Sequence, residues 1–300
     1  MGVTLRFVSV VGGDISLLPY SLNHYRELGV ESFHVIRHVE SRADPTLGPS
    51  VEMMREAGHE FADICVAPWH EDLNAALIRK QMSAWPDDWW IVADLDEFHV
   101  YDRSPAEVAA YCEEHGFDFV EGAFLDRVSA DGRLTGPLPH GGEPLWGQYP
   151  LAGQLTLGLL DGRPTKVTLA RGTVELDLGQ HYAWTGRGVP VEEIYAQVHH
   201  FKWTASARPR LTRRVAAYSS GEWRLLHRSI VGESQRFLDH LGKNGGRIDV
   251  DDPGFRFAHC SLDYTDYPGW EDTGPALRHR FRAYDASRRE KRRTAEAALD

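Results

Sequence analysis

The sequence predicts an α/β protein with a mainly parallel central sheet and helices on both faces. Over the first 125 residues, short β-prone apolar runs alternate with helix-like segments. This alternation is typical of parallel strands joined by crossover helices. Gly29, Gly58 and Gly116 supply helix stops. The predicted strands are 5–11, 32–39, 62–67, 89–93 and 117–124, and the predicted helices are 18–28, 49–57, 72–84 and 105–115.

The pattern becomes irregular after residue 126. Residues 126–164 are rich in glycine and proline, and two short strands are predicted at 165–170 and 173–178. No repeat or low-complexity linker divides the chain, so we predict one domain over residues 1–275 with an irregular C-terminal half. The arginine-rich residues 276–300 are expected to form a solvated surface helix or tail.

The composition excludes some classes of partner. A formal net charge of −11 disfavours nucleic acid as a general partner. No apolar run approaches the roughly 18–20 residues that span a bilayer, so no transmembrane segment is expected, and the N-terminus lacks a signal-peptide pattern. Cys65, Cys112 and Cys260 are isolated and fit no metal motif. Together these features predict a cytoplasmic protein with reduced thiols.

The segment 89–98, Trp-Trp-Ile-Val-Ala-Asp-Leu-Asp-Glu-Phe, carries the strongest functional signal. A β-prone apolar run ends abruptly in three carboxylates, Asp94, Asp96 and Glu97. On a strand, residues two apart point to the same face, so Asp94 and Asp96 would repel each other unless a cation lies between them. Mg²⁺ and Mn²⁺ accept such oxygen ligands, and open α/β sheets bind ligands at the carboxyl ends of strands. The alternative is an acidic turn that simply leaves a buried strand.

The same residues resemble a known family. Asp94-Leu95-Asp96-Glu97-Phe98 is similar to the Asp-x-Asp-Glu-Phe (DXD) motif of family-2-like glycosyltransferases, which have the GT-A fold. Tyr-Arg-Glu-Leu-Gly-Val at 25–30 also resembles that group, whereas Gly-Gly-Asp at 12–14 and Arg-His-Val-Glu-Ser at 37–41 replace its usual loop motifs. A solvated helix face is an equal alternative for the polar residues of helix 72–84. The resemblance implies nucleotide contacts from Val11, Gly12, His38, Asn74, Arg79 and Leu95.

A second signal is the run Val-His-His-Phe-Lys-Trp at 198–203. Imidazoles are costly to bury among aromatic residues without partners, and Mn²⁺ accepts imidazole beside carboxylates. The run resembles the family's His-Tyr/Phe motif, and that register implies that His200 rather than His199 completes the metal site. A structural role is the usual alternative for a histidine. By the same resemblance, Lys202, Arg213 and Arg214 would neutralise the diphosphate leaving group.

Acceptor-binding residues are expected mainly in the second half of the chain. Lys166 and His181 resemble a lysine–histidine pair that the family places near the acceptor pocket. Trp146 and Trp184 are candidate walls for the acceptor, although several of the aromatic residues must belong to the core.

An inverting reaction would need a carboxylate that deprotonates the acceptor. Glu97 and Asp126 are the candidates, and Asp126 is slightly favoured because Glu97 lies close enough to the metal pair to hold the sugar or the acceptor instead. A retaining reaction would need no such base.

These patterns favour a metal-dependent glycosyltransferase of the hexosyl- or N-acetylhexosaminyltransferase class. It would move a sugar from a nucleoside-diphosphate donor, expected to be a UDP-sugar, to a soluble acceptor such as a small metabolite. Residues 1–125 would bind nucleotide and Mn²⁺ or Mg²⁺, and residues 126–275 would bind the acceptor. One alternative is a sugar-nucleotide nucleotidyltransferase, which usually has a basic glycine-rich loop. The other is a non-catalytic carbohydrate- or nucleotide-binding protein.

Overall fold

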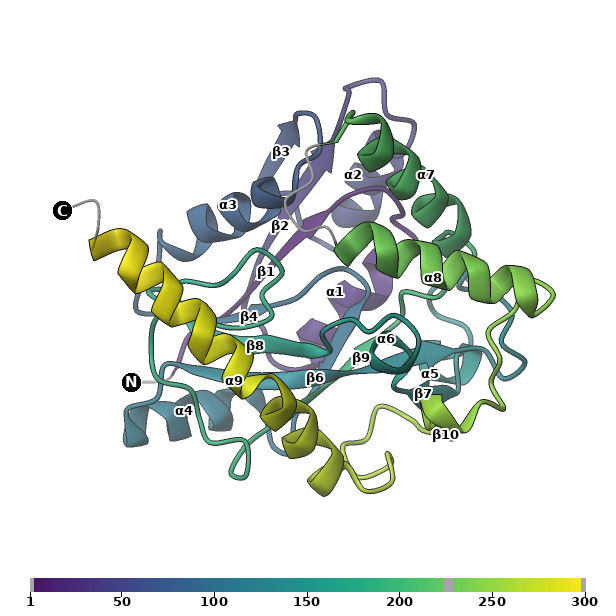
Figure 1. The fold of residues 1–300 in the computed structure, drawn as a ribbon. Coiled ribbons are helices and arrows are strands. Elements are labelled where there is room, and N and C mark those ends of the chain that lie inside the picture. The colour runs from purple at the N-terminus through teal and green to yellow at the C-terminus, as the bar shows by residue number, and fades with distance from the viewer. Residues whose placement is uncertain (1–2, 224–228, 298–300) are drawn as a thin grey trace.

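The computed structural model describes residues 3–223 and 229–297 (Figure 1). Its N-terminal part confirms the predicted α/β alternation. The strands there are β1 (Leu5–Val11), β2 (Ser32–Val39), β3 (Asp63–Val66) and β4 (Trp89–Val92), and the helices are α1 (Leu18–Glu27), α2 (Leu47–Glu56), α3 (Glu71–Met82) and α4 (Pro105–His115). The four strands run parallel in the spatial order β4-β1-β2-β3. Their carboxyl ends therefore meet at one edge of the sheet.

The C-terminal part of the sheet is largely antiparallel. Its strands are β5 (Glu97–Val100), β6 (Phe119–Val128), β7 (Leu151–Gly153), β8 (Thr165–Arg171), β9 (Ala196–His200) and β10 (Ala258–His259). β8 is antiparallel to β4 and β6, β7 is antiparallel to β6 and β10, and β9 lies parallel to β6 and antiparallel to β5. The sheet is thus mixed rather than mainly parallel throughout, because the segments between β6 and β8 contain no long crossover helix, which parallel pairing requires.

The remaining helices are α5 (Leu145–Gln148), α6 (Leu155–Gly158), α7 (Ala207–Ser220), α8 (Ser229–Lys243), the 3₁₀ helix η1 (Pro253–Phe255) and α9 (Trp270–Ala297). The predicted strand 173–178 is wrong, since only Leu176 forms an isolated bridge, to Ala183. A turn begins instead at Gly172, where a Cβ atom would lie 2.4 Å from the Trp85 carbonyl oxygen. This close approach ends the strand pairing. None of the described helices is long and apolar enough to cross a membrane.

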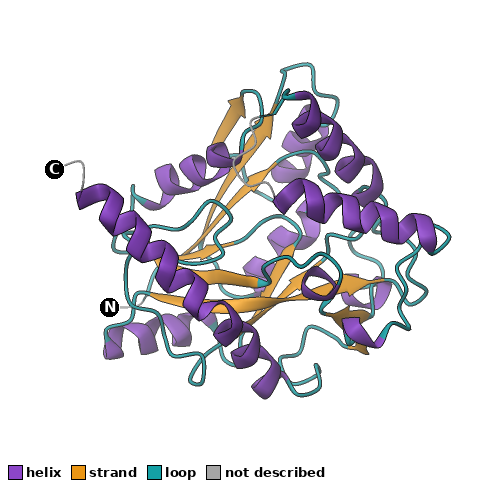
Figure 2. Ribbon diagram, viewed as in Figure 1, coloured by secondary structure: helices purple, strands orange, loops and turns teal. Residues whose placement is uncertain are grey.

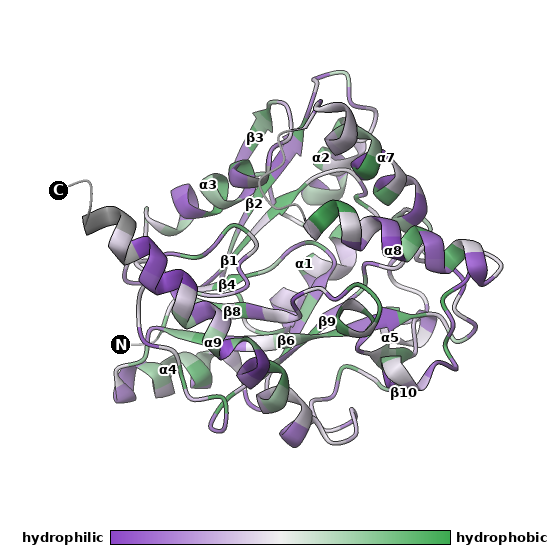
Figure 3. Ribbon diagram, in the orientation of Figure 1, coloured by the Kyte–Doolittle hydropathy of each residue, from purple (hydrophilic) through white to green (hydrophobic). Residues whose placement is uncertain are grey.

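Helix α9 lies along the sheet and is more than the solvated tail predicted for residues 276–300 (Figures 1 and 3). Arg278 and Asp285 are buried, and Arg278 forms ion pairs with Glu121 of β6 at 2.5 Å and with Asp285 at 3.0 Å. The predicted boundary at residue 275 falls inside this helix. Residues 298–300 of the predicted tail lie outside the described residues.

Helices lie against both faces of the parallel strands (Figure 2), and apolar side chains pack between them and the sheet. One core cluster joins β1 to α1, α2 and α4, and a second joins the opposite face to Ile78 and Met82 of α3. Trp89 and Trp90 on β4 are both fully buried, one in each cluster. The alternation of buried side chains explains why the segment before Asp94 is so apolar. Cys65, Cys112 and Cys260 form no disulfide; Cys112 and Cys260 are buried.

The ends of β1 and β2 are held together by Arg37, whose side chain is buried. Its guanidinium donates to the Val11 carbonyl oxygen at 2.8 Å, to the His38 carbonyl oxygen at 2.9 Å and to Ser50 Oγ at 3.1 Å. These bonds satisfy carbonyl groups at the strand ends and fix the two loops that follow. Arg37 thus supports one wall of the cavity described below.

Candidate functional site

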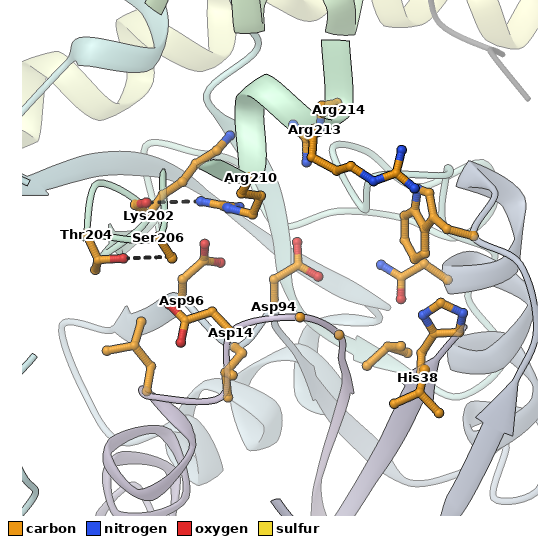
Figure 4. Close-up of a pocket in the computed structure, with 18 of the residues that line it drawn as sticks. Asp14, His38, Asp94, Asp96, Lys202, Thr204, Ser206, Arg210, Arg213 and Arg214 are labelled. Carbon is orange, nitrogen blue, oxygen red and sulfur yellow. Dashed lines mark hydrogen bonds between the residues drawn. The ribbon is translucent and has the colours of Figure 1, made fainter. Parts of the chain in front are cut away.

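A cavity of about 520 Å³ opens at the carboxyl ends of β1, β2 and β4 and is bordered by α7 (Figure 4). This is the edge at which an open α/β sheet commonly binds ligands. The acidic, histidine and basic segments singled out in the sequence all reach it. The polar and charged side chains that line it include Asp14, His38, Glu40, Asp94, Asp96, His200, Lys202, Arg210, Arg213 and Arg214.

Asp94 and Asp96 lie in the turn between β4 and β5, and both line the cavity (Figure 4). Because β4 already ends at Val92, turn geometry rather than strand alternation brings them to the same cavity. Burial and the charges of Glu97 and Asp96 raise the pKa of Asp94, although Lys166 Nζ lies 3.4 Å from its Oδ2. Negative charge is therefore crowded at this wall.

Glu97 lies beneath the cavity and does not line it. Its Oε1 is 2.9 Å from Lys166 Nζ, and both side chains are 1% exposed. Lys166 also donates to the Gly179 carbonyl oxygen and to Gln180 Oε1, each at 3.0 Å. Burial opposes both charges, but their attraction prevails: the pKa of Glu97 is lowered and that of Lys166 is raised. Lys166, predicted to bind the acceptor, is thus the buried counterion of the acidic turn.

The two adjacent histidines of β9 face different surroundings. His200 lines the cavity, with Nε2 3.8 Å from Asp96 Oδ2 and Nδ1 3.2 Å from Asp126 Oδ1. His199 is fully buried between Arg127 and Gln197. Burial and then the charge of Arg127 lower the pKa of His199 well below its ordinary value. Strand alternation separates the pair, and the geometry places His200 at the cavity.

Asp126 is fully buried and lies outside the cavity. It accepts hydrogen bonds from the Thr156 backbone N–H at 2.6 Å, Thr156 Oγ1 at 2.8 Å and Trp203 Nε1 at 2.9 Å, besides facing His200 Nδ1. Burial alone would raise the pKa of Asp126, but His200, Thr156 and Trp203 outweigh it, so the pKa is lowered. The carboxylate is therefore fully engaged by donors.

Three basic side chains border the cavity without an acidic partner. Among the described residues, no carboxylate lies within 4.0 Å of the charged groups of Lys202, Arg210 or Arg214. Arg210 donates to the Lys202 carbonyl oxygen at 3.0 Å, and its Nε is buried without a partner. Burial, followed by the charges of Arg214 and Arg210, lowers the pKa of Lys202 to about 8. Arg213 differs, because it pairs with Glu222 at 2.7 Å and lies over the Trp223 ring.

The opposite end of the cavity is aromatic. His38 contacts the Ala67 carbonyl oxygen through Nε2 at 2.9 Å, and the Trp69 ring centroid is 5.5 Å from that of His38. Asn74 lines this end, and its Oδ1 is buried without a partner. Trp223 Nε1 donates to Glu40 at 3.0 Å across the rim. Flat rings and a free amide oxygen suit a nucleobase-sized ligand.

Several residues predicted for the site lie elsewhere. Arg79 is exposed and pairs with Glu175 at 3.0 Å, and Val11 is a buried strand residue whose carbonyl oxygen faces Arg37. Gly12 and Leu95 do line the cavity. Of the four residues predicted to bind the acceptor, none lines this cavity: Lys166, His181, Trp146 and Trp184.

His181, Trp184 and Trp146 have other surroundings. His181 Nδ1 lies 2.8 Å from the Thr165 carbonyl oxygen, and burial, followed by the charges of Lys166 and Arg163, lowers its pKa to about 3. The Arg292 guanidinium lies 4.8 Å from the Trp184 ring centroid, so this tryptophan helps to hold α9. Trp146 is 40% exposed. The sequence analysis missed Asp14, Trp69 and Arg210, whose only signal was their position next to predicted strand ends or in a basic run.

The donor atoms at the acidic wall are two carboxylates and one imidazole nitrogen, a set that Mg²⁺ or Mn²⁺ accepts. Within residues 3–223 and 229–297, no three His, Cys, Asp or Glu side chains are already arranged to hold a metal ion. The chemistry of Asp94, Asp96 and His200 thus fits the predicted ion, which stays a prediction.

Comparisons with known proteins give limited similarity. No protein-family model matches the chain, and no curated protein matches it. Solved structures with similarity include S. aureus TarS residues 1–349, at 12% identity and a TM-score of 0.35, covering 83% of this chain and 76% of that one.

Two further similarities are to enzymes of sugar-nucleotide synthesis. A Bacillus anthracis structure assigned as a glucose-1-phosphate thymidylyltransferase shows 11% identity and a TM-score of 0.27, covering 47% of this chain and 62% of that one. A UDP-glucose pyrophosphorylase complexed with UDP-glucose shows 10% identity and a TM-score of 0.25, covering 50% and 66%. The chain spans less than two thirds of either structure. The functional proposal therefore rests on the geometry of the site.

Proposed function

We propose that the chain is a glycosyltransferase that takes a sugar from a nucleoside-diphosphate donor. The observation that carries this proposal is the charge arrangement of the cavity. Lys202, Arg210 and Arg214 border it without an ion pair to any carboxylate of residues 3–223 and 229–297, opposite the crowded carboxylates Asp94 and Asp96. Partly buried cations without a counterion are costly, and such groups are retained where a ligand supplies the missing charge.

A diphosphate satisfies the basic side of the cavity, and a divalent ion satisfies the acidic side. Lysine and arginine form charge-assisted hydrogen bonds to phosphate oxygens. Asp94, Asp96 and His200 are the proposed ligands of Mg²⁺ or Mn²⁺, which when bound stabilises charge on phosphate oxygens. Lys202, Arg210 and Arg214 would neutralise the diphosphate as it departs, which is where glycosyl transfer needs electrostatic help. A nucleoside diphosphate bound together with a divalent ion thus explains both walls.

The aromatic end supports a nucleotide rather than an inorganic diphosphate. His38, Trp69 and Trp223 lie around it, and Asn74 Oδ1 is free to accept a hydrogen bond. A uracil nucleotide remains the expected donor, because the family resemblance implies one, and the imide N–H of uracil can donate to such an acceptor.

The acceptor base is a separate question. Glu97 and Asp126 were predicted from the sequence, and both lie outside the cavity. Four donors engage Asp126, and Glu97 is buried in its pair with Lys166, which disfavours both as the base of an inverting reaction; of the two, Glu97 has the fewer contacts to exchange. It would have to exchange its contact with Lys166 to act.

A nucleotidyltransferase is the second candidate, since it also binds a sugar nucleotide. Such enzymes usually cradle phosphates with a basic loop after the first strand, whereas here Gly-Gly-Asp at 12–14 brings an acidic side chain to that position. The basic groups come instead from the segment 202–214. This arrangement favours transfer of the sugar over synthesis of the nucleotide.

The test is direct. Calorimetric titration of UDP, GDP and dTDP, each with Mn²⁺ and with EDTA, should show nucleoside diphosphate binding that strengthens with the metal. Incubation with UDP-sugars and Mn²⁺ should release UDP, through transfer or slow hydrolysis, while sugar 1-phosphate with UTP should release no pyrophosphate. Pyrophosphate release would favour the second candidate. Binding without turnover of any donor would indicate a binding protein, and no nucleotide binding at all would refute the proposal.

A further inference from the structure

We propose that Asp126 is a positioning residue that fixes the ring and the tautomer of His200, so that His200 Nε2 presents its lone pair to the cavity. The inference takes the cavity as the donor site of the proposed function, but its geometry concerns only protein groups. It also implies that the neighbouring His199 holds the opposite tautomer.

The sheet sets the two residues side by side. β9 runs parallel to β6, and Asp126 is the register partner of His200. The imidazole stacks on Phe124 of β6, with ring centroids 4.3 Å apart and planes 19° apart. Phe124 therefore fixes the plane of the ring, and the contact between Nδ1 and Asp126 Oδ1 fixes its rotation within that plane.

The proton on His200 follows from its partner. A carboxylate oxygen accepts hydrogen bonds, and Asp126 already accepts them from the Thr156 backbone N–H, Thr156 Oγ1 and Trp203 Nε1, so it faces His200 as an acceptor. Nδ1 must then carry the proton that points to Asp126. In the neutral ring Nε2 is left unprotonated, and it faces the cavity 3.8 Å from Asp96 Oδ2. A lone pair there can bind a cation or accept a proton.

His199 is fixed in the other form by the same reasoning. Arg127 only donates hydrogen bonds, so the Nδ1 atom of His199 at 3.3 Å from Arg127 Nη1 must accept. Gln197 Nε2 donates to the Tyr264 carbonyl oxygen at 2.8 Å, which turns Gln197 Oε1 toward His199 Nε2 at 3.0 Å. His199 therefore carries its proton on Nε2. Two consecutive histidines with opposite tautomers are a specific prediction.

The remaining bonds to Asp126 hold the carboxylate itself. Thr156 donates to it twice and Trp203 Nε1 once, and Thr156 and Trp203 come from segments on either side of β9 in the sequence. An aspartate with this many fixed donors is rigid and buried, so it suits orientation of a neighbour better than exchange of protons with a substrate. Orientation of His200 thus explains why the Asp126 carboxylate lies beside the cavity without lining it.

The experiment is long-range ¹H–¹⁵N NMR of histidine-labelled full-length protein at a pH where both rings are neutral. His199→Gln and His200→Gln variants identify the two sets of signals. We expect the Nδ1–H form for His200 and the Nε2–H form for His199 in the unsubstituted protein. An Nε2–H form of His200 in the unsubstituted protein would overturn the proposal, whether or not the protein binds nucleotide.

Substitutions sharpen the result. Asp126→Asn should give His200 a mixture of tautomers or the Nε2–H form, while His199 stays unchanged. The asparagine NH₂ group can itself donate to His200 Nδ1, so Nδ1 no longer has to carry the proton. Thr156→Val and Trp203→Phe each remove one donor from Asp126 but leave its contact with His200, so they should leave the His200 tautomer as it is. An unchanged His200 tautomer in folded Asp126→Asn would contradict the positioning role. If that variant does not fold, the tautomers of the unsubstituted protein decide the question.

Discussion

The charged groups at the cavity and those directly beneath it differ in how completely they are paired with other protein groups. At the cavity, Lys202, Arg210 and Arg214 form no ion pair within 4.0 Å with any carboxylate in the part of the chain that the structure describes. One layer deeper, Glu97 is paired with Lys166 and Asp126 is surrounded by four donors. Ion pairing therefore distinguishes the charges of the buried layer from the basic groups at the cavity. Substitutions at the cavity should therefore reduce ligand binding or activity, whereas substitutions in the buried layer should first reduce the stability of the fold.

The largest effect is expected in the buried layer, for Lys166→Met. This substitution leaves Glu97 buried without its counterion, and breaking such a pair typically costs about 3–5 kcal/mol. Urea unfolding followed by circular dichroism measures the loss. Lys80→Met is the matched control, because Lys80 pairs with Asp63 at the surface and its removal should leave the unfolding midpoint nearly unchanged. Equal unfolding midpoints for the two variants would contradict the structural role of the buried pair between Lys166 and Glu97.

Asp96→Asn should separate activity from stability. Asp96 lines the cavity, so the variant should keep its unfolding midpoint, whereas release of UDP from a UDP-sugar should fall by at least about 100-fold. Glu97→Gln is the comparison one residue away. It leaves Lys166 without its closest carboxylate and should lower the unfolding midpoint as well as the activity. Full activity of Asp96→Asn, or of the unsubstituted protein in excess EDTA, would contradict the role of the acidic turn.

Arg214→Gln and Arg213→Gln test the basic side of the cavity. Arg214 forms no ion pair among the described residues, so its loss should weaken UDP binding about 10- to 100-fold, the usual worth of a charged hydrogen bond. Arg213 already pairs with Glu222, so its substitution should change the dissociation constant only slightly. Calorimetric titration at one salt concentration compares the two. A larger loss for Arg213→Gln would favour the grouping predicted from the sequence over the one seen in the structure.

Sequence patterns located the site but did not resolve its layers. The apolar run before Asp94 predicted a buried strand that ends at the acidic residues, because burial leaves a local signal. The His-Phe-Lys run was joined to it only by the family resemblance, and strand β9, which ends at His200, was not predicted. They could not show that Lys166 would be a buried counterion, because its partner Glu97 is distant in sequence. Nor could they show that Arg213 would pair with Glu222, which lies beyond the end of the same helix. Arg210 carried no signal at all beyond its place in a basic helix. The mixed sheet was missed for the same reason, because antiparallel pairing of β6 and β8 is a non-local choice.

The smallest expected effect is a dependence of UDP binding on pH that comes from Lys202. Burial and the charges of Arg214 and Arg210 lower the pKa of Lys202 to about 8 in the free protein. Only the protonated amine attracts a diphosphate, so affinity should be complete below pH 8 and fall as the pH rises through that value. The loss should reach about 10-fold, since one charged hydrogen bond is at stake.

The secondary ionisation of a phosphate group has a pKa near 6, so the ligand does not change charge in this window. Calorimetric titration of UDP with Mg²⁺ from pH 7 to pH 9.5 measures the trend, and binding at pH 9 should be accompanied by uptake of a proton from the buffer, because the bound anion restores the charge on Lys202. Lys202→Met should bind more weakly at pH 7 and lose the dependence. The same slope in Lys202→Met would assign the titration to another group, and the distinction between paired and unpaired charges would then lose its most sensitive test.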